Sequence, residues 1–274
     1  MTAPGPFPLP LGIADSRDTG RPTPDASFII ETRRLAKEFK GFRAVNGVDL
    51  KIRRGTVHAL IGPNGAGKTT CFNLLTKFLK PSSGAIFFNG LDITNCGSAQ
   101  VARMGMVRSF QISSTFINLS VLENVRLALQ QPTRMSFRFW APDSSLGYLD
   151  ERAFELLSQV GLRGFEHLKA GELSYGRKRT LEIATTLALD PTMLLLDEPT
   201  SGMGREDVER LVGLIKRISK DRTVLMVEHN LSVVSDLSDT ITVLARGEIL
   251  AEGSYAAVSR DDLVIEAYMG TGHG

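Results

Sequence analysis

The segment Gly62-Pro63-Asn64-Gly65-Ala66-Gly67-Lys68-Thr69 constrains the fold more than any other part of this sequence. It fits the pattern GxxxxGK[ST] and lies between a short apolar run, Thr56–Ile61, and a helix-like stretch that begins near Gly67. The glycines let successive backbone N–H groups turn toward one anion, and the positive end of the following helix adds to this attraction. Lys68 is expected to reach the terminal phosphates of a nucleotide, and the Thr69 hydroxyl to bind Mg²⁺. The sequence therefore predicts a phosphate-binding loop at the end of a buried strand.

Strand-like and helix-like stretches alternate from Phe28 onward. The runs Met193–Leu196 and Val224–Val227 are apolar at every position, which is typical of parallel strands covered on both faces. We therefore expect an α/β fold with a parallel sheet. Further strands are expected at 28–39, 48–54 and 85–90, a helix at 69–80 that stops at Pro81, and a terminal hairpin at 241–253 that turns at Arg246-Gly247. Between about 112 and 176 the pattern becomes mostly helical, with a polar interruption near 131–149, which predicts a helical subdomain inserted in the core.

The two ends of the chain differ in composition. Residues 1–26 are rich in Pro, Gly and small polar residues, so we expect a disordered tail, and residues 27–274 to form the folded domain. The tail lacks a basic start followed by an apolar stretch, and no apolar run reaches the roughly 18 residues needed to span a bilayer. The net charge of +2 does not require a nucleic acid or an acidic membrane as partner. Cys71 and Cys96 form no disulfide framework, which fits a reducing cytosol.

Two further groups follow apolar strands. Asp197 and Glu198 end the run that starts at Met193, and His229 follows Val224–Val227. Asp197 could bind Mg²⁺, and Glu198 could polarise an attacking water molecule. His229 would lie at the same edge of the sheet, where ligands bind in open α/β folds, and could contact the terminal phosphate.

The stretch Leu173-Ser174-Tyr175-Gly176-Arg177, which continues into a basic helix ending in LEIA, resembles the LSGGQ signature of ABC ATPases. It offers a serine hydroxyl and backbone N–H groups at a helix start, which make a second anion site. Together with the order of the other motifs, the resemblance covers about residues 28 to 270. It implies the fold of a P-loop NTPase of the ABC type, with a parallel sheet, an N-terminal antiparallel β part and the inserted helical subdomain.

The resemblance also implies a role for individual residues. Glu198 matches the catalytic glutamate, His229 the switch histidine, and Lys68 the catalytic lysine of the loop. Phe39 matches the aromatic residue that stacks on adenine, although a core phenylalanine is the competing interpretation. Gln111, in VRSFQ, matches the glutamine that senses Mg²⁺ and the membrane subunit. The expected nucleotide-binding residues are Phe39, Gly62, Pro63, Asn64, Gly65, Ala66, Gly67, Lys68, Thr69, Thr70, Gln111, Ser174 and Gly176, and the expected metal ligands are Thr69, Gln111 and Asp197.

The chain departs from the family pattern at three positions. Tyr175 replaces one of the two glycines of the signature and Arg177 its glutamine, and both substitutions look similar to those in ATPases of branched-chain amino acid importers. Gly204 stands where the family usually has Asp or Asn, in a loop that normally crosses the dimer interface. A glycine can offer only its backbone there.

The implied function is ATP hydrolysis that powers an importer for branched-chain amino acids or similar small solutes. The cofactors would be ATP and Mg²⁺. The expected partners are transmembrane permease subunits, a second ATPase subunit that is identical or related, and indirectly a periplasmic or extracellular solute-binding protein, with no nucleic acid. The chain would be peripheral, on the cytoplasmic face of the inner membrane. Two alternatives stay open, an exporter ATPase of the lipopolysaccharide type and a soluble ABC ATPase outside transport.

Overall fold

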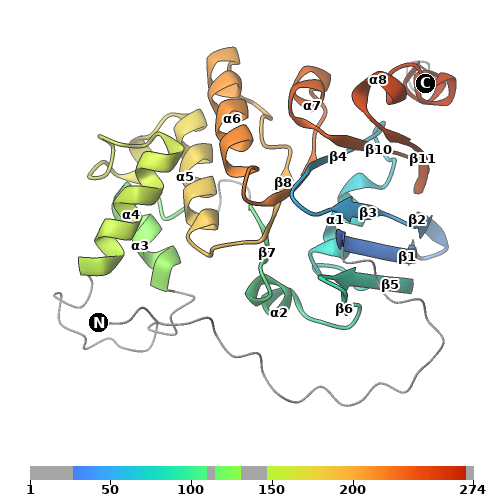
Figure 1. Ribbon diagram of the computed structural model, residues 1–274, viewed down its shortest axis with the longest axis horizontal. Helices are drawn as coiled ribbons and strands as arrows, with labels where there is room; N and C mark the ends of the chain where they lie inside the picture. The colour runs from blue at the N-terminus through green and yellow to red at the C-terminus, as the bar shows by residue number, and fades with distance from the viewer. Residues whose placement is uncertain (1–26, 110–114, 131–146, 270–274) are drawn as a thin grey trace.

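Two sheets form the frame of the computed structural model, which describes residues 27–109, 115–130 and 147–269 (Figure 1). The larger sheet has the strand order β11-β10-β4-β9-β8-β7, in which β11 is antiparallel to β10 and the other neighbours are parallel. Its strands are β4 (Val57–Ile61), β7 (Met106–Arg108), β8 (Met193–Asp197), β9 (Thr223–Val227), β10 (Thr240–Ala245) and β11 (Glu248–Gly253). The parallel sheet expected from the sequence is confirmed.

The parallel strands are buried on both faces. Leu194 and Leu196 of β8 belong to one hydrophobic cluster, whereas Met193 and Leu195 belong to the other. The side chains of a strand alternate between faces, so β4, β8, β9 and β10 each contribute to two cores. The first core contains residues of α6 (Arg205–Ile218) and α7 (Leu231–Leu237), and the second contains residues of α1 (Lys68–Leu75). Figure 1 shows α6 and α7 above this sheet and α1 below it.

The smaller sheet is antiparallel and is built from the N-terminal part of the chain. Its order is β2-β1-β5-β6, and β3 also pairs with β1. The strands are β1 (Phe28–Phe39), β2 (Phe42–Val48), β3 (Lys51–Arg53), β5 (Ser83–Phe88) and β6 (Leu91–Asp92). Leu35, Ile86 and Phe88 of this sheet share the second core with α1, so the antiparallel sheet covers the helix that follows the phosphate loop.

A group of helices forms the opposite side of the molecule (Figure 1). It consists of α3 (Val121–Gln130), α4 (Gly147–Val160) and α5 (Tyr175–Leu187), which contact one another. Helix α2 (Ser98–Arg103) precedes this group in the chain, and the short helix η4 (Ala170–Glu172) lies between α4 and α5. The chain ends in α8 (Tyr255–Val258) and α9 (Asp262–Met269), packed near β10 and β11. Within the described ranges, no helix combines the length and the apolar character needed to cross a membrane.

Most predicted elements are present, but the helix after the phosphate loop ends early. The sequence predicts it over 69–80, whereas α1 stops at Leu75. The Thr76 hydroxyl donates to the Phe72 carbonyl at 2.9 Å, and Lys77 adopts a left-handed φ of 63°. Hydroxyls that bond to their own helix compete with its regular continuation. Of the other predictions, the tail of residues 1–26 and most of the interruption at 131–149 lie outside the described residues.

Leu157→Ala should destabilise the protein. Leu157 is completely buried in α4, so its truncation removes apolar contacts and leaves a cavity, at a cost of about 2–5 kcal/mol in the free energy of unfolding. Leu127→Ala is the matched control, because Leu127 lies on α3 with 38% of its surface exposed. Chemical denaturation measures both, and an equal loss of stability in the two variants would contradict the assigned core.

Candidate functional site

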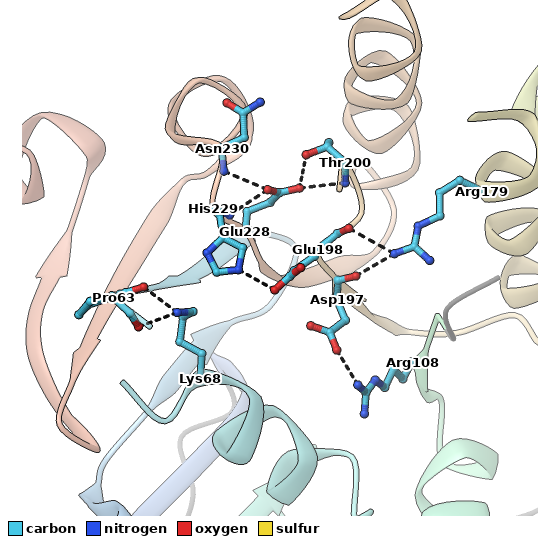
Figure 2. Close-up of polar contacts among 11 residues, drawn as sticks. Pro63, Lys68, Arg108, Arg179, Asp197, Glu198, Thr200, Glu228, His229 and Asn230 are labelled. Atoms are coloured by element: carbon cyan, nitrogen blue, oxygen red, sulfur yellow. Dashed lines mark hydrogen bonds and ion pairs between the residues drawn. The ribbon is translucent and has the colours of Figure 1, made fainter. Parts of the chain in front are cut away.

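Three polar loops meet where β4, β9 and β8 end. These strands are direct neighbours in the sheet, and the carboxyl ends of parallel strands lie at one edge. The phosphate loop follows β4, Glu198 follows β8, and His229 lies two residues after β9. Figure 2 shows Lys68, Glu198 and His229 facing the same space. The structure therefore brings together residues that are up to 161 positions apart in the chain, since 229 minus 68 is 161.

The phosphate loop depends on two glycines that no other residue could replace without distortion. A Cβ at Gly62 would lie 2.1 Å from the Leu244 carbonyl oxygen, and one at Gly67 would lie 2.3 Å from that of Ala44. Both residues also have positive φ, 147° and 97°, a region that glycine adopts without steric cost. Gly67 caps the N-terminus of α1. The loop is thus fixed against β10 and β2 as it enters the helix.

Lys68 is held by the loop that it belongs to. Its Nζ donates to the carbonyl oxygens of Gly62 at 2.6 Å and Pro63 at 2.9 Å. Burial lowers the pKa of the ammonium group below its ordinary value, and the negative charge of Glu198 opposes this shift. Figure 2 shows Lys68 and Glu198 on the two sides of one space.

Glu198 and His229 form a hydrogen-bonded pair. His229 Nε2 lies 2.6 Å from Glu198 Oε1, and a carboxylate can only accept, so this nitrogen donates. Glu198 has a positive φ of 44°, which for a residue with a side chain costs on the order of 1 kcal/mol and persists only where neighbouring groups hold it. Such strain is typical of functional sites, where it fixes the direction of one side chain.

Asp197 is paired with a cation from a neighbouring strand. Arg108 Nη2 donates to Asp197 Oδ2 at 2.6 Å, and Arg108 Nη1 donates to Asn73 Oδ1 at 2.7 Å. The guanidinium also lies 4.9 Å from the ring centroid of Phe72. Arg108 therefore links the acidic end of β8 to α1.

Asp197 and Thr69 suit a magnesium ion by their chemistry. Both offer oxygen donors, and the contact of Asp197 Oδ2 with the Arg108 guanidinium shows that this carboxyl group already faces a cationic group. Among the described residues, no group of three His, Cys, Asp or Glu side chains could hold a metal ion alone. Mg²⁺ commonly uses one or two protein donors together with water and substrate phosphates, so the residues present fit such an ion.

Glu228 connects two of the loops. It is buried, and its Oε1 accepts from the Thr200 backbone N–H at 3.0 Å, while its Oε2 accepts from the N–H groups of His229 at 2.9 Å and Asn230 at 3.1 Å. A buried carboxylate is stable when N–H donors surround it. Figure 2 shows Glu228 between these loops, where it keeps His229 beside Glu198.

The signature residues lie on the helical side of the molecule. The Ser174 hydroxyl caps α5 by accepting from the Arg177 N–H at 3.5 Å, and a Cβ at Gly176 would collide with Asp207 at 2.4 Å. The Tyr175 hydroxyl donates to the Ser201 carbonyl at 3.1 Å. Helix α5 packs against α3, α4 and α6. The signature thus touches the loop after Glu198, and it belongs to the helical group rather than to the sheet edge that carries the phosphate loop.

The remaining predicted residues have separate outcomes. Phe39 ends β1 with 41% of its surface exposed, so the interpretation as a core phenylalanine is wrong. Thr69 is exposed and Thr70 half-buried in the first turn of α1. Gln111 lies outside the described residues, two positions after Ser109, whose N–H donates to the Leu195 carbonyl. Cys71 is fully buried in α1, and burial raises the pKa of its thiol to about 12, which fits an apolar packing role.

Sequence reasoning missed three charged residues of the site, Arg108, Arg179 and Glu228. Arg179 lies on α5 and donates to backbone carbonyls at the end of β8. Each residue carries a weak signal. Arg108 stands three positions before Gln111, Glu228 directly precedes His229, and Arg179 lies in the helix that begins at the signature. A charge next to a buried strand end or at a helix start needs a partner, and this requirement could have identified them.

Two family models match the sequence. The model described as "ABC transporter" matches residues 45–201. The model described as "Branched-chain amino acid ATP-binding cassette transporter" matches residues 248–274.

Curated relatives and solved structures agree with these matches. The chain is 37% identical to the high-affinity branched-chain amino acid transport ATP-binding protein BraF of Pseudomonas aeruginosa, over 88% of this chain and 98% of the relative. It is 35% identical to LivG of Escherichia coli, of the same description, with the same coverage. The ADP conformation of MJ1267, an ATP-binding cassette of an ABC transporter, superposes with a TM-score of 0.76 at 31% identity, covering 89% of this chain and 99% of that one. The dimeric structure of MJ0796, a bacterial ABC transporter cassette, gives 0.69 at 26%, covering 82% and 98%.

Glu182→Gln should change how the stability of the protein depends on pH. Burial raises the pKa of the Glu182 carboxyl from 4.5 to about 7, against the opposing effect of Arg179. The folded protein therefore binds this proton more tightly than the unfolded chain, so the stabilisation is fully present below about pH 4.5 and is lost as pH rises toward 7. Glutamine stays neutral, so the stability of the variant relative to wild type should rise by roughly 1 kcal/mol per pH unit across this window.

Urea unfolding at several pH values measures this difference. Glu209→Gln serves as the control, because Glu209 is exposed on α6. A stability difference between Glu182→Gln and wild type that does not vary with pH would contradict the raised pKa.

Proposed function

The chain belongs to the ABC transporter family of ATP-binding cassettes, and we propose that it is the ATP-hydrolysing subunit of an importer for branched-chain amino acids. The pair Glu198–His229, which faces Lys68 across the end of the sheet, carries this proposal. Such a carboxylate, fixed beside a phosphate-binding loop, is placed to activate water. A binding module without hydrolysis would not need it.

The transported solute is proposed from the relatives. BraF and LivG are described as proteins of branched-chain amino acid transport, and the C-terminal segment 248–274 matches a family model of the same kind. The assignment of the solute rests on these likenesses. They do not favour the exporter or the soluble ATPase as alternatives.

ATP is proposed to bind along the phosphate loop. The N–H groups of the loop and the N-terminus of α1 would receive the phosphates, and Lys68 would exchange its bonds to Gly62 and Pro63 for bonds to phosphate oxygens. The exposed ring of Phe39 would stack on adenine, a contact typically worth about 1–3 kcal/mol. Gln111 is proposed to lie near the terminal phosphate.

Hydrolysis would use the groups at the ends of β8 and β9. Glu198 would accept a proton from the attacking water, and His229 would hold the carboxylate in position through its hydrogen bond. Asp197 and Thr69, with Gln111, would hold Mg²⁺, which neutralises phosphate charge when bound. Phosphoryl transfer depends mainly on positioning and charge stabilisation, so Lys68 contributes by stabilising negative charge on the phosphates.

A second ATPase subunit is proposed to complete the site. Ser174 and Gly176 lie at the start of α5, on the helical side of the molecule, where they would form an anion site. They would contact a nucleotide held by the second subunit in a head-to-tail dimer. MJ0796, a similar cassette, forms a dimer. The partner is an identical or a sister subunit.

Permease subunits are proposed to bind the helical group. Phe116, Ile117 and Leu168 are 59%, 55% and 42% exposed. Two backbone hydrogen bonds join the segment of Phe116 and Ile117 to the segment of Leu168. The Ile117 carbonyl accepts from the Gly171 N–H, and the Leu168 carbonyl accepts from the Val121 N–H. An exposed apolar cluster of this kind suits contact with a membrane subunit. The chain would then sit peripherally on the cytoplasmic face of the inner membrane, and a solute-binding protein would act on the far side.

Glu198→Gln should bind ATP and dimerise stably but hydrolyse at least about 100-fold more slowly, because a neutral amide cannot accept the proton from water. Steady-state phosphate release and gel filtration with ATP measure the two properties. Glu209→Gln is the control for the chemical change, because Glu209 is exposed outside the site. Near-normal turnover of the Glu198 variant would refute the assigned base.

The transport role is tested by isolating the tagged protein from gently solubilised native membranes and identifying its companions by mass spectrometry. We expect two permeases and a second ATPase subunit, because the similar proteins BraF and LivG are described as ATP-binding proteins of transport. Recovery with exporter subunits, or with ribosomal proteins and no permease, would overturn the importer assignment and leave the ATPase chemistry unaffected.

A further inference from the structure

The side chain of Arg179 crosses from the signature helix α5 to the backbone that carries Glu198. Its Nη2 donates to the carbonyl oxygens of Asp197 at 2.8 Å and of Glu198 at 3.3 Å, and its Nε donates to that of Pro199 at 3.4 Å. Figure 2 shows the guanidinium facing this turn. Only 6% of Arg179 is exposed, so water hardly competes for these carbonyls. One side chain therefore contacts three consecutive peptide groups.

Glu182 fixes the guanidinium from one turn further along the helix. Arg179 Nη1 donates to Glu182 Oε2 at 2.7 Å, and Glu182 is 1% exposed. Both partners of this ion pair are buried, and a buried pair of charges is costly unless it is well hydrogen-bonded. Glu182 Oε1 makes no hydrogen bond within the described residues. The ion pair thus holds the Arg179 side chain in one direction, although one carboxylate oxygen of Glu182 lacks a hydrogen bond within the described residues.

The contacted turn needs such support. Strand β8 ends at Asp197, so the following carbonyl groups leave the sheet ladder, and Glu198 has a positive φ. Its N–H is held by the Val227 carbonyl at 2.9 Å, and its carbonyl also accepts from the Ser201 N–H at 3.1 Å. From the side of α5, Arg179 adds its hydrogen bonds to the backbone carbonyl groups of this turn. Backbone held from several directions keeps one conformation despite local strain.

We propose that Arg179 is a positioning residue for ATP hydrolysis, which fixes the backbone turn of Glu198 from the helix that begins at the signature. The proposal rests on the proposed role of Glu198 as the base. Arg179 does not reach the reacting atoms. It acts by holding the direction in which the carboxylate of Glu198 points.

A second contact links the same two segments. The Tyr175 hydroxyl, in the first turn of α5, donates to the Ser201 carbonyl at 3.1 Å. Helix α5 is therefore joined to the turn of residues 197–201 near its start and again at Arg179. Gly204, further along this loop, has no side chain with which to form a contact. A shift of α5 when the signature binds a nucleotide would accordingly reach Glu198 of the same chain.

An arginine is required by this geometry. Its planar fork presents donors in several fixed directions, whereas a lysine presents three donors from one point. Arg179→Lys retains the charge opposite Glu182 but cannot contact three carbonyls and the carboxylate together. This variant therefore removes positioning while it keeps the buried ion pair.

The test compares Arg179→Lys, Glu198→Gln and the double variant in the full chain. Steady-state hydrolysis gives kcat and KM for ATP, calorimetry gives the affinity for ADP, and thermal unfolding gives Tm. Arg179→Lys should lower kcat about 10- to 100-fold, as expected for a misplaced group, with affinity for ADP within about threefold of wild type. The double variant should turn over as slowly as Glu198→Gln alone, because residues that act as a unit are not additive.

Arg217→Lys, on the exposed end of α6, is the matched control and should behave as wild type. If Arg179→Lys does not fold, Arg179→Gln, which keeps a planar donor without the buried charge, is measured in the same way. Wild-type kcat, a parallel loss of ADP affinity, or an additive double variant would overturn the proposal while Glu198 kept its role. Normal turnover of Glu198→Gln would remove that role and the proposal with it.

Discussion

The parallel pairing of β4, β9 and β8 is the constraint on which the rest of the structure depends. Hydrogen bonds between these neighbours fix their order and register, and helices or strands cover both faces of the sheet. Inside a strand buried on both faces a polar side chain needs a partner, as His58 of β4 has in Thr242 at 2.7 Å, so most polar groups lie at the strand ends. The phosphate loop, Glu198 and His229 therefore gather at one edge, and their distances follow from the spacing of the strands.

Much of this arrangement could be predicted from the sequence, because it depends on local patterns. The apolar run that starts at Met193 and the loop of Gly62 to Thr69 identify strand, turn and helix within a few residues. The end of α1 could not be predicted, since the hydroxyl of Thr76 competes with the helix in a way that apolar periodicity does not record. The contacts of Arg108, Arg179 and Glu228 depend on which distant segments become neighbours.

The charged groups of the site are arranged so that each has a partner within the protein. Lys68 is bonded to loop carbonyls, Asp197 to Arg108, and Glu198 to His229. Glu228 collects N–H donors from two loops. Paired charges of this kind rigidify a site, whereas an unpaired buried charge would distort it. The same pairs determine the direction of each side chain, so the electrostatic balance and the geometry of the site have a common origin.

The sheet is also a wall shared by two cores, and this has a consequence for how the sequence can change. Leu194 packs in the core of the helical side, and the adjacent Leu195 packs in the core of α1 and the antiparallel sheet. Neighbouring positions in one strand thus pack against different sets of side chains. Replacements at Leu194 should be compensated among residues such as Leu181, and those at Leu195 among residues such as Phe72. The two halves of the molecule can therefore change separately in evolution, although β4, β8, β9 and β10 contribute side chains to both.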